Sequence, residues 1–145
     1  MIKKIALLYF VVLFSGCASA EISISEIPLS VDSVQTYRVN KSLIRIIQHN
    51  MEMSPRLEIQ RLSTPGIKLV EELIIENIKL KNQMIDFSDS SGTYIESLVL
   101  ANGVIKFSIE HFFSGSSGGE IFIDCTLDVK GNQFSQPVCV EKEGK

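Results

Sequence analysis

A run of glycine and serine residues in the last third of the chain matches a catalytic motif letter for letter. Gly115-Ser116-Ser117-Gly118-Gly119 fits G-x-S-x-G, which in α/β-hydrolases places a nucleophilic serine on a tight turn between a strand and a helix. Here a strand-like segment follows the run, and both histidines, His49 and His111, precede it, whereas these hydrolases carry their histidine after the serine. We therefore interpret residues 114–119 as a flexible hairpin loop and predict no catalytic residue.

Oxygen-bearing side chains also gather between Asp86 and Ser91, ahead of Gly92. Calcium loops of the EF-hand type place an acid at the first position, glycine at the sixth and glutamate at the twelfth. The first and twelfth positions would hold Phe87 and Leu98, so the spacing does not fit. Neither histidine has acids or cysteines at metal-binding spacing. We expect no metal, no cofactor and no enzymatic activity.

The segment Ser91-Gly92-Thr93-Tyr94 resembles the Ser-Gly-x-x-Tyr loop of bacterial periplasmic lysozyme inhibitors, with the tyrosine one residue earlier. Those inhibitors are small exported β domains, some of them lipoproteins, and their loop enters the lysozyme cleft. A plain turn before a strand is the alternative interpretation. Because loops on rigid scaffolds carry much of the binding function, we predict two binding loops, with candidate residues Asp89, Ser91, Gly92, Tyr94, Ser116 and Ser117.

The first twenty residues have the pattern of a bacterial export signal. Lys3 and Lys4 are followed by a ten-residue apolar run, Ile5 to Phe14, and then by small residues. A bilayer-spanning helix needs about 20 apolar residues, so the run is too short to span a membrane and fits a signal peptide. We predict an export signal over residues 1–20 and a single small exported domain over residues 21–145.

Two cleavage sites are compatible with this signal. Ala18-Ser19-Ala20 forms an A-x-A site that would be cut before Glu21. The stretch Leu13 to Cys17 resembles a lipoprotein lipobox, although Phe14 stands where an aliphatic residue is expected. That resemblance implies cleavage before Cys17, lipidation of Cys17 and an anchor in the outer membrane. We favour the lipoprotein, located in the periplasm and held at the outer membrane.

Three cysteines would leave one unpaired in an exported protein, and cleavage at either site accounts for the third. Cys17 is either removed or acylated, which leaves Cys125 and Cys139 in an oxidising compartment. A hairpin folded about Asn132, in the turn signal Lys130-Gly131-Asn132, would place Cys125 opposite Cys139. We predict a disulfide between them; two free buried thiols are the alternative.

Alternation of apolar and polar residues predicts strands in the second half of the chain. Residues 105–109 alternate strictly, and residues 120–129 alternate with Phe122 as the one exception. Residues 94–101 are strand-like, and Asn102-Gly103 is a strong hairpin signal. Residues 134–140 form the last predicted strand, which should lie at an edge or carry a bulge because Pro137 lacks an N–H donor. These segments predict a four-stranded antiparallel meander.

The first half allows more than one interpretation. Apolar residues between Leu43 and Met51 have helical spacing, although a strand over residues 43–48 is the rival. Residues 57–59 begin a short strand, residues 67–75 form a helix or an extended run, and residues 78–87 form a strand. A helix over 67–75 would place Glu71 and Glu72 on a solvated face. We expect a mainly β, sandwich-like fold with one or two short helices in this half, with α+β as the alternative.

The 145 residues suffice for one domain, and the net charge of −3 becomes more negative once the export signal and its two lysines are removed. An acidic domain has no electrostatic footprint for nucleic acid or anionic lipid, and this charge by itself selects no partner. A small domain without a reactive constellation favours binding over catalysis, so we expect an envelope or secreted protein as partner. We interpret the chain as a non-catalytic protein-binding module such as an inhibitor or an immunity protein. The alternatives are a structural envelope lipoprotein and an unrecognised enzyme.

Overall fold

The computed structural model describes residues 28–81, 83–115 and 118–142. The whole predicted export signal, Cys17 included, lies outside these ranges, as do residues 21–27, Ser116 and Ser117. No helix with the length and apolar character of a membrane span occurs in the described part of the chain. Its regular elements are all strands: β1 (Val31–Val39), β2 (Ser42–His49), β3 (Leu57–Ser63), β4 (Lys68–Ile75), β5 (Asn77–Leu80), β6 (Gln83–Asp86), β7 (Ser90–Ala101), β8 (Val104–Phe113), β9 (Glu120–Asp128) and β10 (Val138–Glu141).

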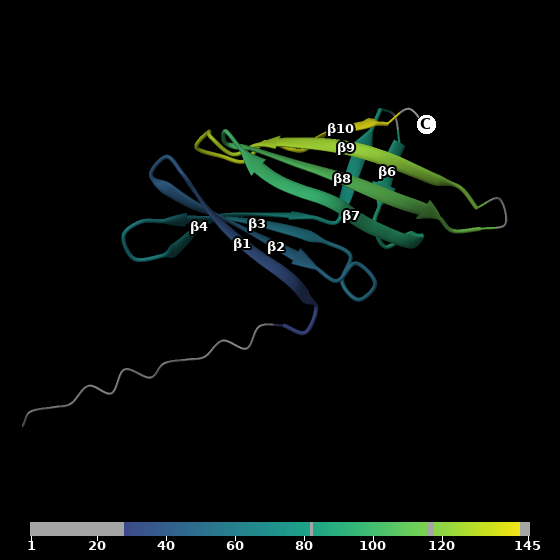
Figure 1. The fold of residues 1–145 in the computed structure, drawn as a ribbon, viewed down its shortest axis with the longest axis horizontal. Coiled ribbons are helices and arrows are strands. Elements are labelled where there is room, and N and C mark those ends of the chain that lie inside the picture. Colours follow the sequence, from purple (N-terminus) through teal and green to yellow (C-terminus); the bar gives the residue numbers. More distant parts are fainter. Residues whose placement is uncertain (1–27, 82, 116–117, 143–145) are drawn as a thin grey trace, which may run out of the picture.

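The strands form two four-stranded antiparallel sheets and one small hairpin. The first sheet has the order β1-β2-β3-β4, the second has the order β10-β9-β8-β7, and β5 pairs with β6. Figure 1 shows the two sheets stacked face to face. The mainly β class is confirmed, and so is the antiparallel meander predicted for the second half.

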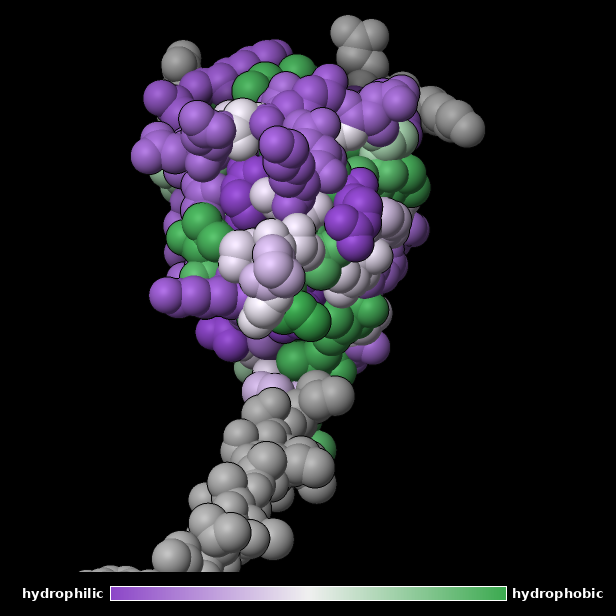
Figure 2. Space-filling view, turned by 90° about the vertical axis from the view of Figure 1, so that its left-hand side faces the viewer, coloured by the Kyte–Doolittle hydropathy of each residue, from purple (hydrophilic) through white to green (hydrophobic). Residues whose placement is uncertain are grey.

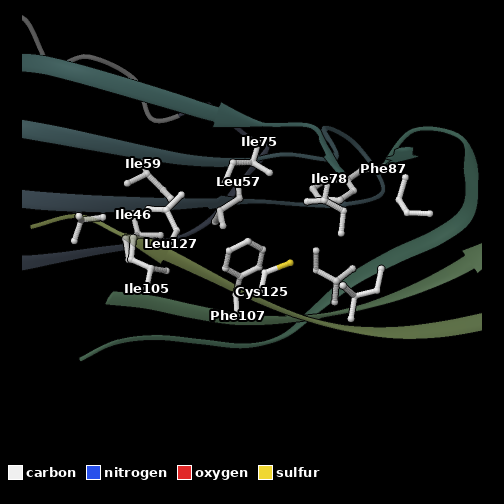
Figure 3. Close-up of a cluster of buried hydrophobic side chains, with 14 of the residues drawn as sticks. Ile46, Leu57, Ile59, Ile75, Ile78, Phe87, Ile105, Phe107, Cys125 and Leu127 are labelled. Carbon is white, nitrogen blue, oxygen red and sulfur yellow. The ribbon is translucent and has the colours of Figure 1, made fainter. Parts of the chain in front are cut away.

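Apolar side chains on alternate positions of both sheets meet between them and form the core. In β8, Ile105, Phe107 and Ile109 are buried, whereas Lys106 between them is exposed. Burying each such side chain contributes about 1.5–3 kcal/mol to folding. Figure 3 shows the core that the two sheets and the small hairpin share. The first sheet supplies Ile46, Leu57, Ile59 and Ile75, and the second sheet supplies Ile105, Phe107, Cys125 and Leu127. The hairpin supplies Ile78, and Phe87 follows the hairpin in the chain.

The hairpin β5–β6 joins the two sheets in sequence and closes one side of the sandwich. Its buried side chains Ile78, Leu80 and Ile85 enter the core, and β5 contacts β10. Its turn begins at Lys81, which has a left-handed φ of 51°. The predicted single strand over residues 78–87 is therefore two strands, because the chain must reverse to keep these apolar side chains on the core.

An ion pair within the first sheet, between the buried Arg61 and the partly buried Glu71, also contacts the second sheet. The Arg61 Nε donates to the Glu71 Oε2 at 3.0 Å, and its Nη1 donates to the Val129 carbonyl at 3.2 Å. The guanidinium also lies 4.7 Å from the ring centroid of Phe134, whose N–H donates to the Glu71 Oε1 at 2.6 Å. The pair thus holds the segment after β9 against β3 and β4.

The predicted helices are absent from the described residues, and residues 43–51 are the clearest correction. They lie in β2 and the turn after it, and β2 pairs with β1 on one side and β3 on the other. Ile44 and Ile46 face the core, while Leu43 and Ile47 lie on the opposite face, half-buried. Apolar residues on both faces of a strand imitate helical spacing, which explains the wrong prediction.

For residues 67–75, the extended run is the correct one of the two predicted alternatives, because the strand β4 occupies this segment and no helix forms there. Glu71 alternates with Glu72, so the two carboxylates lie on opposite faces of the sheet. Glu72 is exposed, as predicted, but Glu71 is turned toward Arg61 in the interior. The prediction that both are solvated was wrong for Glu71.

The turns and edges of the second sheet follow the sequence signals closely. Asn102 and Gly103 have left-handed φ angles of 51° and 70° and join β7 to β8. β10 is an edge strand, as the proline predicted, but it begins only at Val138. Residues 134–137 lie outside any strand, because Phe134 packs on Arg61 and Pro137 has no N–H to donate.

One end of the sandwich differs in polarity between its two halves. Figure 2 looks onto the end where the β1–β2, β3–β4 and β7–β8 hairpins turn; hydrophilic side chains cover most of the upper part, on the side of the second sheet. A group of apolar side chains lies lower down, on the side of the first sheet. The β3–β4 hairpin of this sheet has exposed apolar side chains, namely Ile67, Leu69 and Val70.

Candidate binding face

The first predicted binding loop is mostly strand. Asp89 lies in the turn after β6, but Ser91, Gly92 and Tyr94 belong to β7. Gly92 pairs with Phe112 of β8, and the register shifts between Ser90 and Gly92. The segment is therefore paired with β8 and is not a free loop. Its polar residues form the beginning of β7, the long edge strand of the second sheet. Ser116 and Ser117 of the other predicted loop lie outside the described residues.

Tyr94 points away from the core and is 41% exposed. Its ring meets the ring of Phe112 edge to face, with centroids 6.0 Å apart. A Cβ atom on Gly92 would lie 3.0 Å from the tyrosine ring, so the ring lies directly over this glycine. The glycine lets Tyr94 lie flat against its own strand, where it presents an aromatic surface to solvent.

Tyr94 is one member of a larger surface, the outer face of the second sheet. The register places Tyr94, Glu110 and Phe122 in one row across β7, β8 and β9. Phe122, the exception in the predicted alternation, is 38% exposed on this face. The face consists of the outward side chains Tyr94, Glu96, Ser97, Val99, Lys106, Ser108, Glu110, Phe112, Glu120, Phe122, Asp124, Thr126, Val138 and Val140.

Carboxylates alternate with the aromatic rings on this face. Partial burial raises the pKa of Glu110 above its usual range, and a hydrogen bond with Glu96 and the charges of Glu96 and Glu120 act in the same direction. Like charges this close disfavour a second negative charge. The face is thus rich in negative charge that its own residues do not fully neutralise, with Lys106 and Lys142 as the nearby cations.

A hollow of about 310 Å³ lies on this face, lined by Glu96, Ser97, Ser108, Phe122, Asp124 and Lys142. Hydrogen bonds order its floor: the Ser97 Oγ donates to the Ser108 Oγ at 3.2 Å, and the Ser108 Oγ donates to the Asp124 Oδ1 at 2.6 Å. The Lys142 Nζ lies 3.8 Å from the Asp124 Oδ2 and is largely exposed. The hollow therefore combines carboxylate and hydroxyl oxygens with one aromatic wall.

His111 lies on the opposite, inner side of β8 and is buried. Its Nδ1 is 3.0 Å from the Thr93 Oγ1, which also donates to the Phe87 carbonyl at 3.2 Å. Burial lowers the pKa of His111, and the charge of Asp89 opposes this shift. The histidine therefore packs as a neutral side chain in the core.

The pH dependence of stability should carry a contribution from His111. Because the folded protein holds this imidazole neutral, the unfolded chain binds the proton more readily below about pH 6.5. This contribution is present above that pH and is lost as the pH falls. Urea unfolding at about pH 7.5 and about pH 5.5 should show a larger fall in midpoint for the wild type than for His111→Gln. Equal falls in the two proteins would contradict the assignment.

The other histidine belongs to a serine–histidine–glutamate chain on the first sheet. The His49 Nδ1 is 3.1 Å from the Ser30 Oγ, and its Nε2 is 3.3 Å from the Glu58 Oε2. Hydrolase triads use the nitrogens the other way round, with the acid on Nδ1 and the serine on Nε2. His49 is also only 2% exposed. The chain of contacts serves to tie the start of β1 to β2 and β3.

The structure brings together residues that the sequence pattern left scattered. Cys125 and Cys139 are paired in register and bonded, which confirms the predicted disulfide. The outer face of the second sheet was missed, although one signal was present: Phe122 stands where the alternation calls for a polar residue. Within the described residues, no three His, Cys, Asp or Glu side chains are placed to hold a metal ion.

Comparison with known proteins adds no relative to this description. No protein-family model, no curated protein and no solved structure matches the chain.

Proposed function

We propose that the chain is an exported, non-catalytic protein-binding module of the bacterial cell envelope, such as an inhibitor or an immunity protein. The observation that supports this proposal is the outer face of the second sheet, where Tyr94, Phe122 and Val99 are exposed together with Val138 and Val140. These apolar side chains share one sheet face with the charged residues between them, and aromatic side chains are enriched in protein interfaces. A rigid sheet can present such a surface without an ordering cost.

Two further features support export. The disulfide between Cys125 and Cys139 suits an oxidising compartment. The N-terminal pattern of lysines, a short apolar run and small residues is that of a signal peptide. Both agree with a partner in the periplasm or outside the cell. The resemblance around Tyr94 makes a lysozyme one candidate among such partners.

Affinity capture of the tagged full-length protein from its own cell envelope tests the proposal. We expect a wall hydrolase or a toxin to be recovered in about equal amount with the wild type. Tyr94→Ala should reduce that recovery at least about tenfold, because aromatic anchors carry much of the binding energy of protein interfaces. Quantitative mass spectrometry of the captured proteins provides the measurement.

Ile74→Ala is the matched control, because Ile74 is 45% exposed on the first sheet. It removes a similar apolar area from the other side of the molecule and should leave recovery unchanged. Recovery of bulk envelope proteins alone, with no enriched partner, would contradict the binding module and favour a structural envelope lipoprotein. Equal losses with both variants would instead indicate a general loss of the folded protein.

The mode of anchoring gives a separate prediction. We expect the mature protein to begin at Cys17 and to carry acyl chains on it, so that it partitions with the outer membrane. Cys17→Ser should move the protein to the soluble fraction or block its processing. Intact mass of the wild-type protein decides the point: a chain that begins at Glu21 without lipid would contradict the lipoprotein and leave export in place.

A further inference from the structure

The outer face of the second sheet has no covering element among the described residues. Figure 1 shows the hairpin β5–β6 at the side of the sandwich, not over this face. Val99, Val138 and Val140 are all more than half exposed. A sheet face with this much apolar surface is usually covered by another element or by a partner.

The charges of this face restrict what can cover it. Among its outward positions are the acidic residues Glu96, Glu110, Glu120 and Asp124. The same strands carry the basic residue Lys106 on this face. Partial burial and the neighbouring carboxylates already raise the pKa of Glu110. An anionic lipid surface, a nucleic acid or an acidic protein would add further repulsion. A partner with positive charge would relieve it and would satisfy the carboxylates.

The hollow at the centre of the face suits one kind of side chain in particular. Glu96 and Asp124 supply carboxylates at its rim, and Ser97 and Ser108 supply hydroxyl oxygens on its floor. The largely exposed Lys142 also lines the hollow, with its Nζ 3.8 Å from the Asp124 Oδ2, so a cation of the partner would take the place of this side chain. The ring of Phe122 forms a wall along which a methylene stem can pack. A long side chain with an apolar stem and a cationic head matches both parts, since lysine and arginine bury their stems while their charge remains hydrated or paired.

We propose that the outer face of the second sheet docks a basic protein surface, and that the hollow between Glu96, Phe122 and Asp124 receives a lysine or arginine side chain of that partner. The inference rests on the proposed binding function and adds the chemistry of the partner. The aromatic and valine side chains around the hollow provide the apolar contact, and the carboxylates provide the charge complementarity that steers association.

A lysine hexapeptide is the probe that tests the chemistry without the natural partner. It is titrated into the ¹⁵N-labelled protein, purified from the envelope, while backbone amide shifts are recorded. We expect shifts concentrated in β7, β8 and β9 around the hollow, and none of comparable size in the first sheet. The binding should weaken when salt screens the charges. A glutamate hexapeptide should cause no such shifts.

Variants then locate the binding. The double variant Glu96→Gln with Asp124→Asn should weaken the hexapeptide affinity about fivefold, because it removes two partly exposed charge pairs. Glu72→Gln on the first sheet is the matched control and should leave the affinity unchanged. Exposed positions are substituted by near-isosteric amides, and the dispersion of the amide spectrum verifies that each variant is folded.

Each other outcome overturns the inference. Shifts spread evenly over acidic residues, or concentrated in the first sheet, would exclude this face. Calcium chloride producing the same shifts at lower concentration would indicate a cation site instead of a docking surface. If the lysine hexapeptide does not bind but the envelope capture recovers a partner, only the basic character of the partner is refuted. If the hexapeptide binds but the capture recovers no partner, the proposed function is refuted.

Discussion

Replacing Glu71 by alanine should lower the free energy of unfolding by about 3 kcal/mol, because it leaves a buried guanidinium without its carboxylate. Arg61 is 8% exposed, and the Glu71 Oε2 accepts from its Nε at 3.0 Å. The other carboxylate oxygen accepts the Phe134 N–H at 2.6 Å. The substitution therefore removes an ion pair and unties the segment between β9 and β10 in one step.

Glu72→Ala is the matched control for this effect. Glu72 is the next residue of the same strand, but it is exposed and accepts a hydrogen bond from the Gln60 side chain at 2.9 Å. Its loss should cost less than about 1 kcal/mol, as for other exposed polar contacts. Urea unfolding followed by far-ultraviolet circular dichroism measures both variants. Similar losses for the two would show that the Arg61–Glu71 pair is not specially stabilising.

A double variant separates the ion pair from the packing around it. Arg61→Met with Glu71→Leu replaces the two charges by apolar side chains of similar volume. Replacing both partners of a buried pair is often neutral or stabilising, whereas removing one partner is costly. We therefore expect the double variant to regain most of the stability lost in Glu71→Ala. A double variant as unstable as the single one would locate the loss in the Phe134 segment instead.

Removing the disulfide by Cys125→Ala with Cys139→Ala should also lower the free energy of unfolding by about 3 kcal/mol. The bridge joins residues 14 positions apart, so it restricts a loop of the unfolded chain. It also ties β10, a strand of four residues with one paired neighbour, to the central part of β9. Without it, the edge strand depends on few backbone hydrogen bonds.

Reduction of the wild-type protein distinguishes loss of the bridge from loss of core volume. Cys125 is 1% exposed in the core, so an alanine there also removes packing. The wild type in excess dithiothreitol should lose most of the stability that the double variant loses, and the double variant should not respond to dithiothreitol. Unfolding midpoints of the wild type that are equal with and without reductant would contradict the predicted contribution.

The first half of the chain shows why periodicity alone was insufficient there. Leu43, Ile46, Ile47 and Met51 fit a helical stripe, and the same spacing arises when a strand has apolar residues on both faces. β2 is such a strand, because it lies between β1 and β3 with its outer face partly covered by its neighbours. The choice between helix and strand depended on whether adjacent segments were available to pair.

The candidate site was predicted only in part, and Tyr94 shows where prediction stopped. Its sequence neighbours indicated a loop, but pairing with β8 made the segment a strand. Its partners on the outer face, such as Glu110 and Phe122, come from separate strands and become neighbours only through the sheet register. In the sequence, the local feature that indicated this face was Phe122, an aromatic residue at a position where the alternation predicts a polar one.

The meander of the second half could be predicted from the sequence, including the register that opposes Cys125 and Cys139. Strict alternation and the Asn102-Gly103 turn act between neighbouring segments, so local chemistry is sufficient. The contact of Arg61 with Val129, 68 residues away, and the open face of the second sheet could not be predicted from the sequence. Those features depend on how two sheets stack, and stacking is governed by the summed burial of many side chains rather than by any short pattern.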